Sequence, residues 1–433
     1  MSVSCPAGGS YVTLSPRQAL TAAPYALYAV NAGSALTSDL LDGQHAAAFQ
    51  QHYQNVRVVA KSGGDFTTIT AALNSISDAS AANPYLIYVA PGVYTETITM
   101  KPYVDIEGAG ELATKITFTG SSELDTGTVV SANNAELRFL TVENTGGTFD
   151  YAVAIYNSSG APRLTHVTAS ASGAGSENYA VYISGNSSPT MTNVTATAWG
   201  GTNNNFGVFS FSTPSYTMMN VVANATGGSA NYAVYNESCS PMMTNVTATA
   251  SEGGTNFGVY NLVSSSIMID IRAIAFGGGS GNYGVYNESS SPMMTNVTAT
   301  ASGAGYNSGV YNDYSTPTMV DVTATASGGT YNYGMYNDMA SPTIQGSLIT
   351  ASGGTSEGIH NAASITGYGP YTVTINNSQI AGGSNTIYTE VASYTTRVGA
   401  SQLVGNGGQG LGTYKCVASY NGNFDPLGTA TCR

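Results

Sequence analysis

From about residue 150 onward, short apolar runs alternate with polar residues and are separated by turns rich in glycine, serine and asparagine. A phrase of the form (Tyr/Phe)-(Gly/Ala)-Val-Tyr-Asn recurs every 24–27 residues, as in YAVYN at 232–236 and YGVYN at 283–287. A second phrase, SPMMTNVTATA at 240–250 and again at 291–301, follows the first. Each unit therefore contains three β-prone runs and no helical period, which predicts one three-stranded coil of a parallel β-helix.

Alternation within the first phrase predicts which side chains point inward, because successive side chains of a strand face opposite sides. The inward set is Val181, Val208, Val234, Val259, Val285, Val310, Met335 and Ile359. The outward set is Tyr182, Phe209, Tyr235, Tyr260, Tyr286, Tyr311 and Tyr336. An exposed aromatic ladder of this kind could hold a sugar chain by stacking, provide a lateral contact between subunits, or only stabilise its own face of the solenoid.

Two asparagine series keep the same register. The first is Asn236, Asn261, Asn287, Asn312, Asn337 and Asn361. The second is Asn193, Asn220, Asn245 and Asn296, with Asp270 and Asp321 taking the place of asparagine in two coils. We expect both series at turns, where asparagine tolerates left-handed backbone geometry and can hydrogen-bond from coil to coil.

Charge is scarce: only 8% of the 433 residues are charged, and the formal net charge is −13. With 11 Lys and Arg in the whole chain, no basic patch could neutralise a run of phosphates, so nucleic acid is excluded as a partner. No run of 18 apolar residues appears, so membrane insertion is not expected, and the N-terminus shows no signal-peptide pattern.

Residues 56–118 contain a Gly-Asp-Phe-x-Thr-Ile turn into a short helical segment, an apolar run ending in Pro-Gly-x-Tyr, and a Gly-x-Gly turn. The residues that carry these motifs are Gly64, Asp65, Phe66, Ile69, Ala72, Pro91, Gly92, Tyr94, Gly108 and Gly110. This segment resembles the opening of the pectin-methylesterase/pectate-lyase-like β-helix superfamily. The resemblance implies an all-β, right-handed parallel β-helix, and the repeat sets its coils at about 25 residues.

Residues 15–49 carry the pattern LTxxPYAxxA followed by LDG, which resembles a connector of secreted bacterial surface proteins and tail-fibre-like proteins. This resemblance implies that the chain is the downstream part of a larger secreted precursor. A helix that caps the open end of the solenoid is compatible with the same residues. We therefore expect a connector and cap at 1–55, the first coils at 56–150, the repetitive β-helix at 151–400 and a C-terminal cap at 401–433.

The cysteines suggest an oxidising location. Cys416 and Cys432 bracket a short segment near the C-terminus and are predicted to form a disulfide that closes the cap, which suits an extracellular or cell-surface protein. Cys239 is expected on a turn, either as a free thiol or linked to Cys5.

Catalytic motifs are not apparent. The Gln-Asp-Thr and Asp-Phe-Ile-Phe-Gly segments of the esterases are missing, and acidic residues on the coils are sparse. Asp270 and Arg272 are best explained as an outward ion pair, and neither His166 nor His360 has a triad partner nearby in sequence. We therefore predict no catalytic residues, no metal, no cofactor and no enzymatic activity.

The functional prediction is a non-catalytic extracellular solenoid that assembles head-to-tail with copies of itself into a filament, stalk or fibre, since open sheet edges favour such pairing. The alternative is a carbohydrate-binding adhesin or tail-spike-like module that holds a polysaccharide on the tyrosine ladder. A polysaccharide lyase or esterase ranks third.

Overall fold

The computed structural model describes residues 53, 55–120, 123–365, 367–429 and 431–433, together with four short strands nearer the N-terminus. Those strands are β1 (Ser2–Val3), β2 (Val12–Thr13), β3 (Leu40–Leu41) and β4 (Gln44–His45). β1 pairs antiparallel with β2, and β3 pairs antiparallel with β4. The connector predicted at 15–49 otherwise lies outside the described residues, as does Cys5. Gln54–Arg433 forms a compact unit, which is described here by itself.

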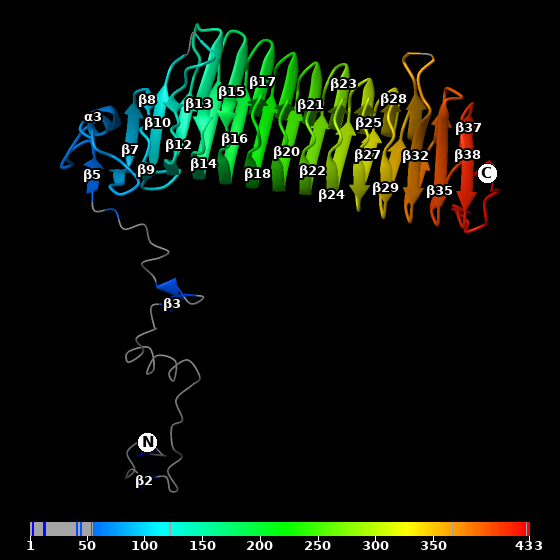
Figure 1. The fold of residues 1–433 in the computed structure, drawn as a ribbon, viewed down its shortest axis with the longest axis horizontal. Coiled ribbons are helices and arrows are strands. Elements are labelled where there is room, and N and C mark those ends of the chain that lie inside the picture. The colour runs from blue at the N-terminus through cyan, green and yellow to red at the C-terminus, as the bar shows by residue number, and fades with distance from the viewer. Residues whose placement is uncertain are drawn as a thin grey trace. The chain divides into compact units, whose positions relative to one another are not determined.

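Two parallel sheets wind through this unit as one stack of coils (Figure 1). We call the 13-stranded sheet the tyrosine sheet. Its strands are β8 (Ile98–Thr99), β11 (Val129–Val130), β13 (Tyr151–Gly160), β15 (Glu177–Ser187), β17 (Asn204–Phe211), β19 (Ala230–Glu237), β21 (Thr255–Leu262), β23 (Gly281–Glu288), β25 (Tyr306–Asp313), β28 (Tyr331–Asp338), β31 (Thr355–Ala362), β34 (Asn385–Thr389) and β37 (Gly408–Gly410).

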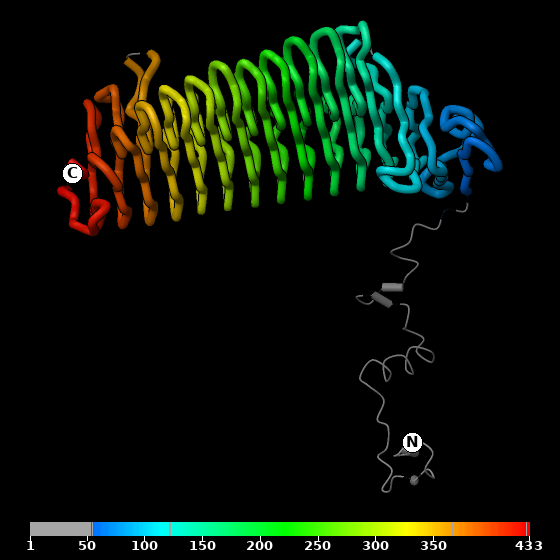
Figure 2. The backbone as a smooth tube through the Cα atoms, turned by 180° about the vertical axis from the view of Figure 1, so that it is seen from behind, coloured from blue at the N-terminus to red at the C-terminus, as the bar shows by residue number. Residues whose placement is uncertain are grey.

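We call the 22-stranded sheet the bent sheet. Its strands are β5 (Asn55–Val59), β6 (Tyr85–Val89), β7 (Gly92–Thr95), β9 (Val104–Gly108), β10 (Thr114–Phe118), β12 (Glu136–Asn144), β14 (Arg163–Ser172), β16 (Thr190–Trp199), β18 (Thr217–Thr226), β20 (Met242–Ser251), β22 (Ile267–Phe276), β24 (Met293–Ser302), β26 (Thr318–Val320), β27 (Thr323–Ser327), β29 (Thr343–Gln345), β30 (Leu348–Ser352), β32 (Tyr371–Asn376), β33 (Gln379–Gly382), β35 (Tyr394–Gly399), β36 (Gln402–Val404), β38 (Thr413–Val417) and β39 (Tyr420–Asn421). Figure 2 shows the regular stacking of the coils from behind. The predicted all-β parallel solenoid is confirmed.

Apolar columns fill the interior between the two sheets. The predicted inward residues from Val181 to Ile359 are at most 1% exposed, and each pairs with its counterpart one coil away. Met191 and Ala196 of the bent sheet are equally buried on the other side of the core. Each coil places one large apolar side chain at the same inward position. This accounts for the nearly constant repeat length, because one inserted residue would turn the inward side chains of that strand to the outer face.

A single left-handed residue bends each coil of the bent sheet. This position has φ of 53° in Asn193, 52° in Asn245 and 56° in Asp270. The asparagines here bond from coil to coil: Asn245 Nδ2 donates to Asn220 Oδ1 over 2.8 Å. We call Asn193, Asn220, Asn245, Asp270, Asn296 and Asp321 the bend column. The expected pair of Asp270 with Arg272 is replaced by a bond from Asn296 Nδ2 to Asp270 Oδ1 of 2.6 Å.

The other predicted asparagine series lies inside the solenoid and not at a turn. Asn236 to Asn361 sit within strands of the tyrosine sheet, are fully buried, and are linked by amide–amide bonds of 2.9 Å. We call this series the inner column. A second buried series, absent from the sequence analysis, runs parallel to it and bonds to the preceding turns. It contains Asn178, Asn205, Asn231, Asn256, Asn282, Asn307 and Asn332.

Both ends of the unit are covered. The helix α3 (Ile69–Asn74) begins after the N-cap Thr68 and buries Ile69, Ala72 and Leu73 against the first coils. At the other end a disulfide joins Cys416 to Cys432, whereas Cys239 is a buried free thiol. Among the described residues, no helix is long and apolar enough to cross a membrane. Head-to-tail assembly stays a prediction.

Candidate active face

The outer surface of the tyrosine sheet carries two aromatic rows, because the strands β15, β17, β19, β21, β23 and β28 each place two rings outward, three residues apart. The first row is Tyr179, Phe206, Tyr232, Phe257, Tyr283 and Tyr333. The second row is Tyr156 followed by the seven residues predicted from the sequence, Tyr182, Phe209, Tyr235, Tyr260, Tyr286, Tyr311 and Tyr336. The structure thus brings all seven predicted ladder residues together in one row.

Rings of the second row stack on one another along the solenoid axis. The centroids of Tyr235 and Tyr260 lie 5.0 Å apart with planes only 7° from parallel, and those of Tyr286 and Tyr311 lie 4.6 Å apart. The rings are half-buried and not exposed, because their faces are covered by neighbouring rings. A sugar therefore cannot stack on a ring face within the row, and it would meet ring edges and hydroxyl groups instead.

Burial also keeps these hydroxyl groups protonated. It raises the pKa of the Tyr260 hydroxyl well above its usual value, and the hydrogen bond to Glu288 raises it further. Burial raises the pKa of Tyr286 and Tyr311 in the same way. The face is therefore lined by permanent hydroxyl donors, which suit the hydroxyl groups of a glycan.

Carboxyl groups run along one edge of the second aromatic row. We call Glu237, Glu288, Asp313, Asp338 and Glu390 the acidic column. Glu288, Asp313 and Asp338 occupy successive coils in direct register. Glu237 accepts a bond of 3.0 Å from Tyr235, and Glu288 accepts one from Tyr260. Glu288 and Asp338 flank Asp313 on the two neighbouring coils, and their charges disfavour ionisation of the Asp313 carboxyl group.

Asp313 is the carboxyl group in the middle of this set. Its Oδ1 is buried and has no hydrogen-bond partner among the described residues. Burial, followed by the charges of Asp338 and Glu288, raises the pKa of Asp313 to about 6. Asp338 is held differently, because the backbone N–H of Ser364 donates to it over 2.8 Å and the Ser364 hydroxyl donates to it as well. A carboxyl group whose pKa is raised by burial and by neighbouring charges is suited to act as an acid in catalysis.

The acidic column ends beside a buried histidine. In β31 the two outward positions of the aromatic rows are taken by Glu357 and His360. Glu357 Oε2 lies 2.5 Å from His360 Nδ1, and Glu390 Oε1 lies 3.3 Å from His360 Nε2. Glu357 and His360 are buried, Glu390 is half-exposed, and the ring of Tyr336 stacks on the imidazole at 4.6 Å. The expectation that His360 has no triad partner nearby in sequence did not foresee Glu357, which precedes it by three residues and contacts its imidazole.

The bent sheet has a second charged cluster, in its first coils. Arg138 Nη2 lies 2.7 Å from Glu107 Oε2, and Arg138 Nη1 lies 2.8 Å from Glu136 Oε2. Arg163 adds a contact of 3.5 Å to Glu136. Each carboxylate is paired with a guanidinium, so these groups are less suited to proton transfer than the acidic column. Among the described residues, no group of His, Cys, Asp and Glu is arranged to hold a metal ion.

The strands of the tyrosine sheet contain no lysine or arginine, and the acidic column gives its outer face negative charge, although Arg433 donates to Gln409 of the last strand. A polyuronate has a carboxylate on every sugar and would be repelled by the acidic column. An uncharged glycan, or one whose carboxylates are esterified, escapes this repulsion. The electrostatics thus favour an uncharged chain on this face.

Comparison with known proteins identifies the fold. The Pectinesterase family model matches residues 55–173. The A-module of Azotobacter vinelandii mannuronan C-5 epimerase AlgE4 is 18% identical, with 74% of this chain and 92% of that chain covered at a TM-score of 0.54. This chain has the pectin-methylesterase/pectate-lyase-like parallel β-helix fold.

Two further structures resemble this β-helix more distantly. Pectate lyase Pel9A is 14% identical over 72% of this chain and 78% of its own, with a TM-score of 0.41. Tailspike protein 2 from Escherichia coli O157:H7 bacteriophage CAB120 is 12% identical over 67% and 38%, with a TM-score of 0.37. No curated protein matches the chain.

The prediction that this β-helix is not an enzyme is overturned by these comparisons. The finding that overturns it is the match of residues 55–173 to the Pectinesterase family model, which describes an esterase family. Carboxyl groups that occur once per coil look sparse along the sequence, and the stacking of the coils brings them into one column. Glu288, Asp313 and Asp338 are about 25 residues apart in sequence but adjacent in space.

Proposed function

We propose that this β-helix is a carbohydrate-active enzyme that cleaves glycosidic bonds of an uncharged polysaccharide lying along the tyrosine sheet. Asp313 would be the proton donor and Glu288 the partner carboxylate. The observation that carries the proposal is the row of carboxyl groups on successive coils beside the aromatic face. The match to an esterase family and the enzymes of the same fold support a carbohydrate-active role.

The proposed chemistry needs one acid and one nucleophile. Asp313 gives its proton to the glycosidic oxygen as the bond from that oxygen to the anomeric carbon breaks and Glu288 forms a bond to that carbon. Water then adds to the anomeric carbon, the bond to Glu288 breaks, and the proton of the water returns to Asp313. Adjacent coils place the two Cα atoms about 4.8 Å apart, close to the about 5–5.5 Å that separates the carboxyl groups of retaining glycosidases.

The environment of Asp313 suits the acid role. A general acid works best when its pKa lies near the working pH, and burial raises the pKa of Asp313 to about 6. Glu288 is held in place by the hydroxyl of Tyr260. The tyrosine hydroxyls on either side would bind sugar hydroxyls and align the polymer across the coils.

The test is cleavage by the full chain and its Asp313→Asn variant. Neutral glucans, mannan, xylan, methyl-esterified pectin, polygalacturonate and alginate are incubated with each protein, and new reducing ends are measured. We expect cleavage of an uncharged polymer and a loss of about 10²–10⁴-fold in Asp313→Asn. Glu237→Gln is the matched control, because it removes a carboxylate of the same column two coils from Glu288.

Three results would contradict the proposal. The first is equal activity of wild type and Asp313→Asn, and the second is cleavage of polyuronates alone. The third is binding without cleavage of any polymer, which would favour the carbohydrate-binding alternative raised by the sequence. An extracellular or cell-surface location remains a further prediction, supported by the Cys416–Cys432 disulfide, a bond typical of oxidising compartments.

A further inference from the structure

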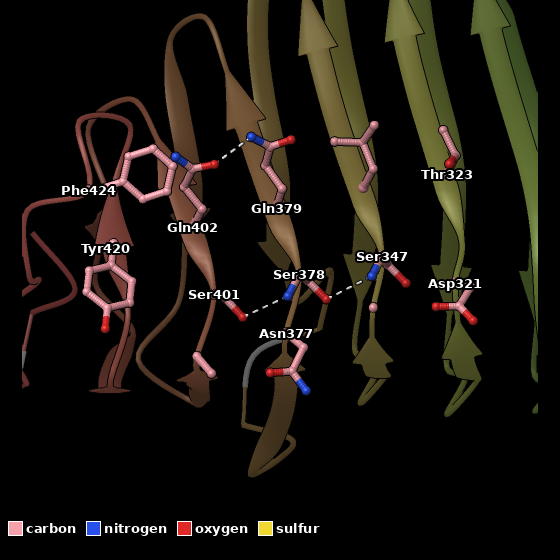
Figure 3. A pocket seen from close by; sticks show the side chains of 13 residues that line it. Asp321, Thr323, Ser347, Asn377, Ser378, Gln379, Ser401, Gln402, Tyr420 and Phe424 are labelled. Carbon is pink, nitrogen blue, oxygen red and sulfur yellow. Dashed lines mark hydrogen bonds between the residues drawn. The ribbon is translucent and has the colours of Figure 1, made fainter.

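A groove of about 790 Å³ lies on the bent sheet, away from the residues of the tyrosine sheet. It runs across the last five coils, along the positions where a residue with positive φ bends each coil and along the strand that follows each bend (Figure 3). At the bend its lining is Asp321, Gly346, Asn377 and Ala400, and on the adjoining strand it is Thr323, Leu348, Gln379, Gln402 and Tyr420, with Phe424 at one end.

The groove exists because the bend column is interrupted. In the central coils an asparagine or aspartate occupies each bend position, and the amides bond across the surface. In the last coils Gly346 and Ala400 take this position with φ of 61° and 46°. Ala400 carries only a methyl group where asparagine stands elsewhere, and at Gly346 the carboxylate of Asp321 leans into the space of the missing side chain.

The polar walls are fixed in orientation. Gln379 Nε2 donates to Gln402 Oε1 over 2.6 Å, and Figure 3 shows the amide oxygen of Gln379 turned away from Gln402, toward the side of Thr323. Beneath them, Ser378 N donates to Ser401 Oγ over 3.1 Å, as part of a spine of buried serines. Preorganised amides of this kind bind hydroxyl groups with little loss of side-chain entropy.

The aromatic end differs from the tyrosine sheet. Phe424 is 73% exposed and Tyr420 is 41% exposed, and neither ring stacks on another ring of the described residues. Their faces are therefore available to the apolar face of a sugar, which the stacked rings of the tyrosine sheet are not. Asp321 is the only charged residue of the lining.

We propose that this groove is a second carbohydrate-binding site, which holds a short segment of an uncharged glycan. Five coils span about 20 Å along the axis, enough for a short oligosaccharide. Fixed amides would read hydroxyl groups, and the free rings of Tyr420 and Phe424 would stack on a sugar at one end. The site needs no catalytic group, so it stands whether or not the tyrosine sheet cleaves glycans.

The test is binding by the full chain carrying Asp313→Asn, so that no substrate is consumed. Retardation in native gels that contain neutral glucan, mannan or xylan is measured, and affinities for the matching hexasaccharides are determined by calorimetry. We expect two classes of binding site, and we expect Phe424→Ala to weaken the one that belongs to the groove at least tenfold. Phe276→Ala is the matched control, because it removes an aromatic side chain that is 42% exposed on the same sheet outside the groove.

Ala400→Asn provides a second variant that removes no contact. It restores the bend column next to Asn377 and fills the groove, so we expect it to abolish the groove's share of binding while leaving the melting temperature unchanged. Cleavage of hexasaccharides, assayed with Asp313 intact, should be unaffected by either variant. The proposal is overturned if Phe424→Ala and Ala400→Asn both bind like the parent, if Phe276→Ala loses as much affinity, or if no glycan of the panel binds.

Discussion

The inner column and the bend column contain the same side chain in nearly the same arrangement, but in different surroundings. In both, one amide donates to the amide of the neighbouring coil over about 2.9 Å, as Asn261 does to Asn287 inside and Asn245 does to Asn220 outside. Asn287 is fully buried, whereas Asn245 is exposed. Water replaces a lost bond at the bend but cannot do so inside, so only the inner column should be costly to break.

This difference explains how the two columns vary along the chain. The inner column keeps asparagine in six successive coils, from Asn236 to Asn361. The bend column accepts aspartate at Asp270 and is replaced by Gly346 and Ala400. A position that needs only a left-handed backbone is free to change its side chain, and the groove arises where it does.

The largest effect should come from breaking the buried partner of a polar pair. We expect Glu357→Ala to lower the free energy of unfolding by about 4 kcal/mol, because it leaves His360 buried without the carboxylate and frees the amide of Asn385. Glu390→Ala removes the half-exposed partner of the same imidazole and should cost less than about 1 kcal/mol. Urea unfolding of the three proteins measures this. Equal losses would show that burial does not control the strength of these contacts.

The asparagine columns allow a direct version of the same test. Asn287→Ala leaves Asn261 Nδ2 and Asn312 Oδ1 unpaired in the interior, so we expect a loss of about 3 kcal/mol. Asn245→Gly removes one amide at the exposed bend and should change stability by less than about 0.5 kcal/mol. Hydrogen exchange of the strands on either side, together with urea unfolding, reports both. A bend variant as unstable as the interior one would refute the distinction.

The repeat predicted the solenoid, the Val column and the positions of the seven aromatic residues, because a period of about 25 residues with alternating polarity admits few other folds. It did not predict the inner column. Asn236 follows an outward tyrosine and so should face inward, but the preference of asparagine for turns outweighed this parity.

The His360 site was missed for a geometric reason. Residues three apart face opposite sides of a regular strand, so Glu357 and His360 do not look like partners. In this fold two consecutive buried residues, Gly358 and Ile359, separate them and turn both outward. The repeated Tyr-x-x-Tyr pattern was the signal for this geometry, and its replacement by Glu-x-x-His in a single coil marked the site.

A smaller effect should distinguish the contribution of the backbone conformation to stability from that of the side-chain hydrogen bond at the bend. Asn245 has φ of 52°, a conformation that alanine adopts only with strain. We expect Asn245→Ala to cost about 1.5 kcal/mol while Asn245→Gly costs almost nothing, because glycine adopts this φ freely. Thermal melting of the two variants side by side checks the difference. If both lost the same stability, the amide bond and not the backbone would be what the bend requires.

The smallest effect concerns Asp313, which is less buried than Glu357 and less exposed than Glu390. Its pKa is raised to about 6 in the folded chain, from an ordinary value of 3.8, so the folded state binds the proton more tightly than the unfolded state does. The free energy of unfolding should therefore fall as the pH rises from about 4 to about 6, and above about pH 6 it should stay lower by the whole of this loss. Because the group is partly exposed, we expect this cost to be only about 1 kcal/mol.

Asp313→Asn removes this titration. It should be as stable as the wild type at pH 4 and more stable at pH 8. Urea unfolding between pH 4 and pH 8 measures the difference. Parallel curves for wild type and Asp313→Asn would mean that Asp313 is ionised like an exposed carboxylate. The group would then lack the proton it must donate near neutral pH, and the proposed acid of the tyrosine sheet would have to be another member of the acidic column.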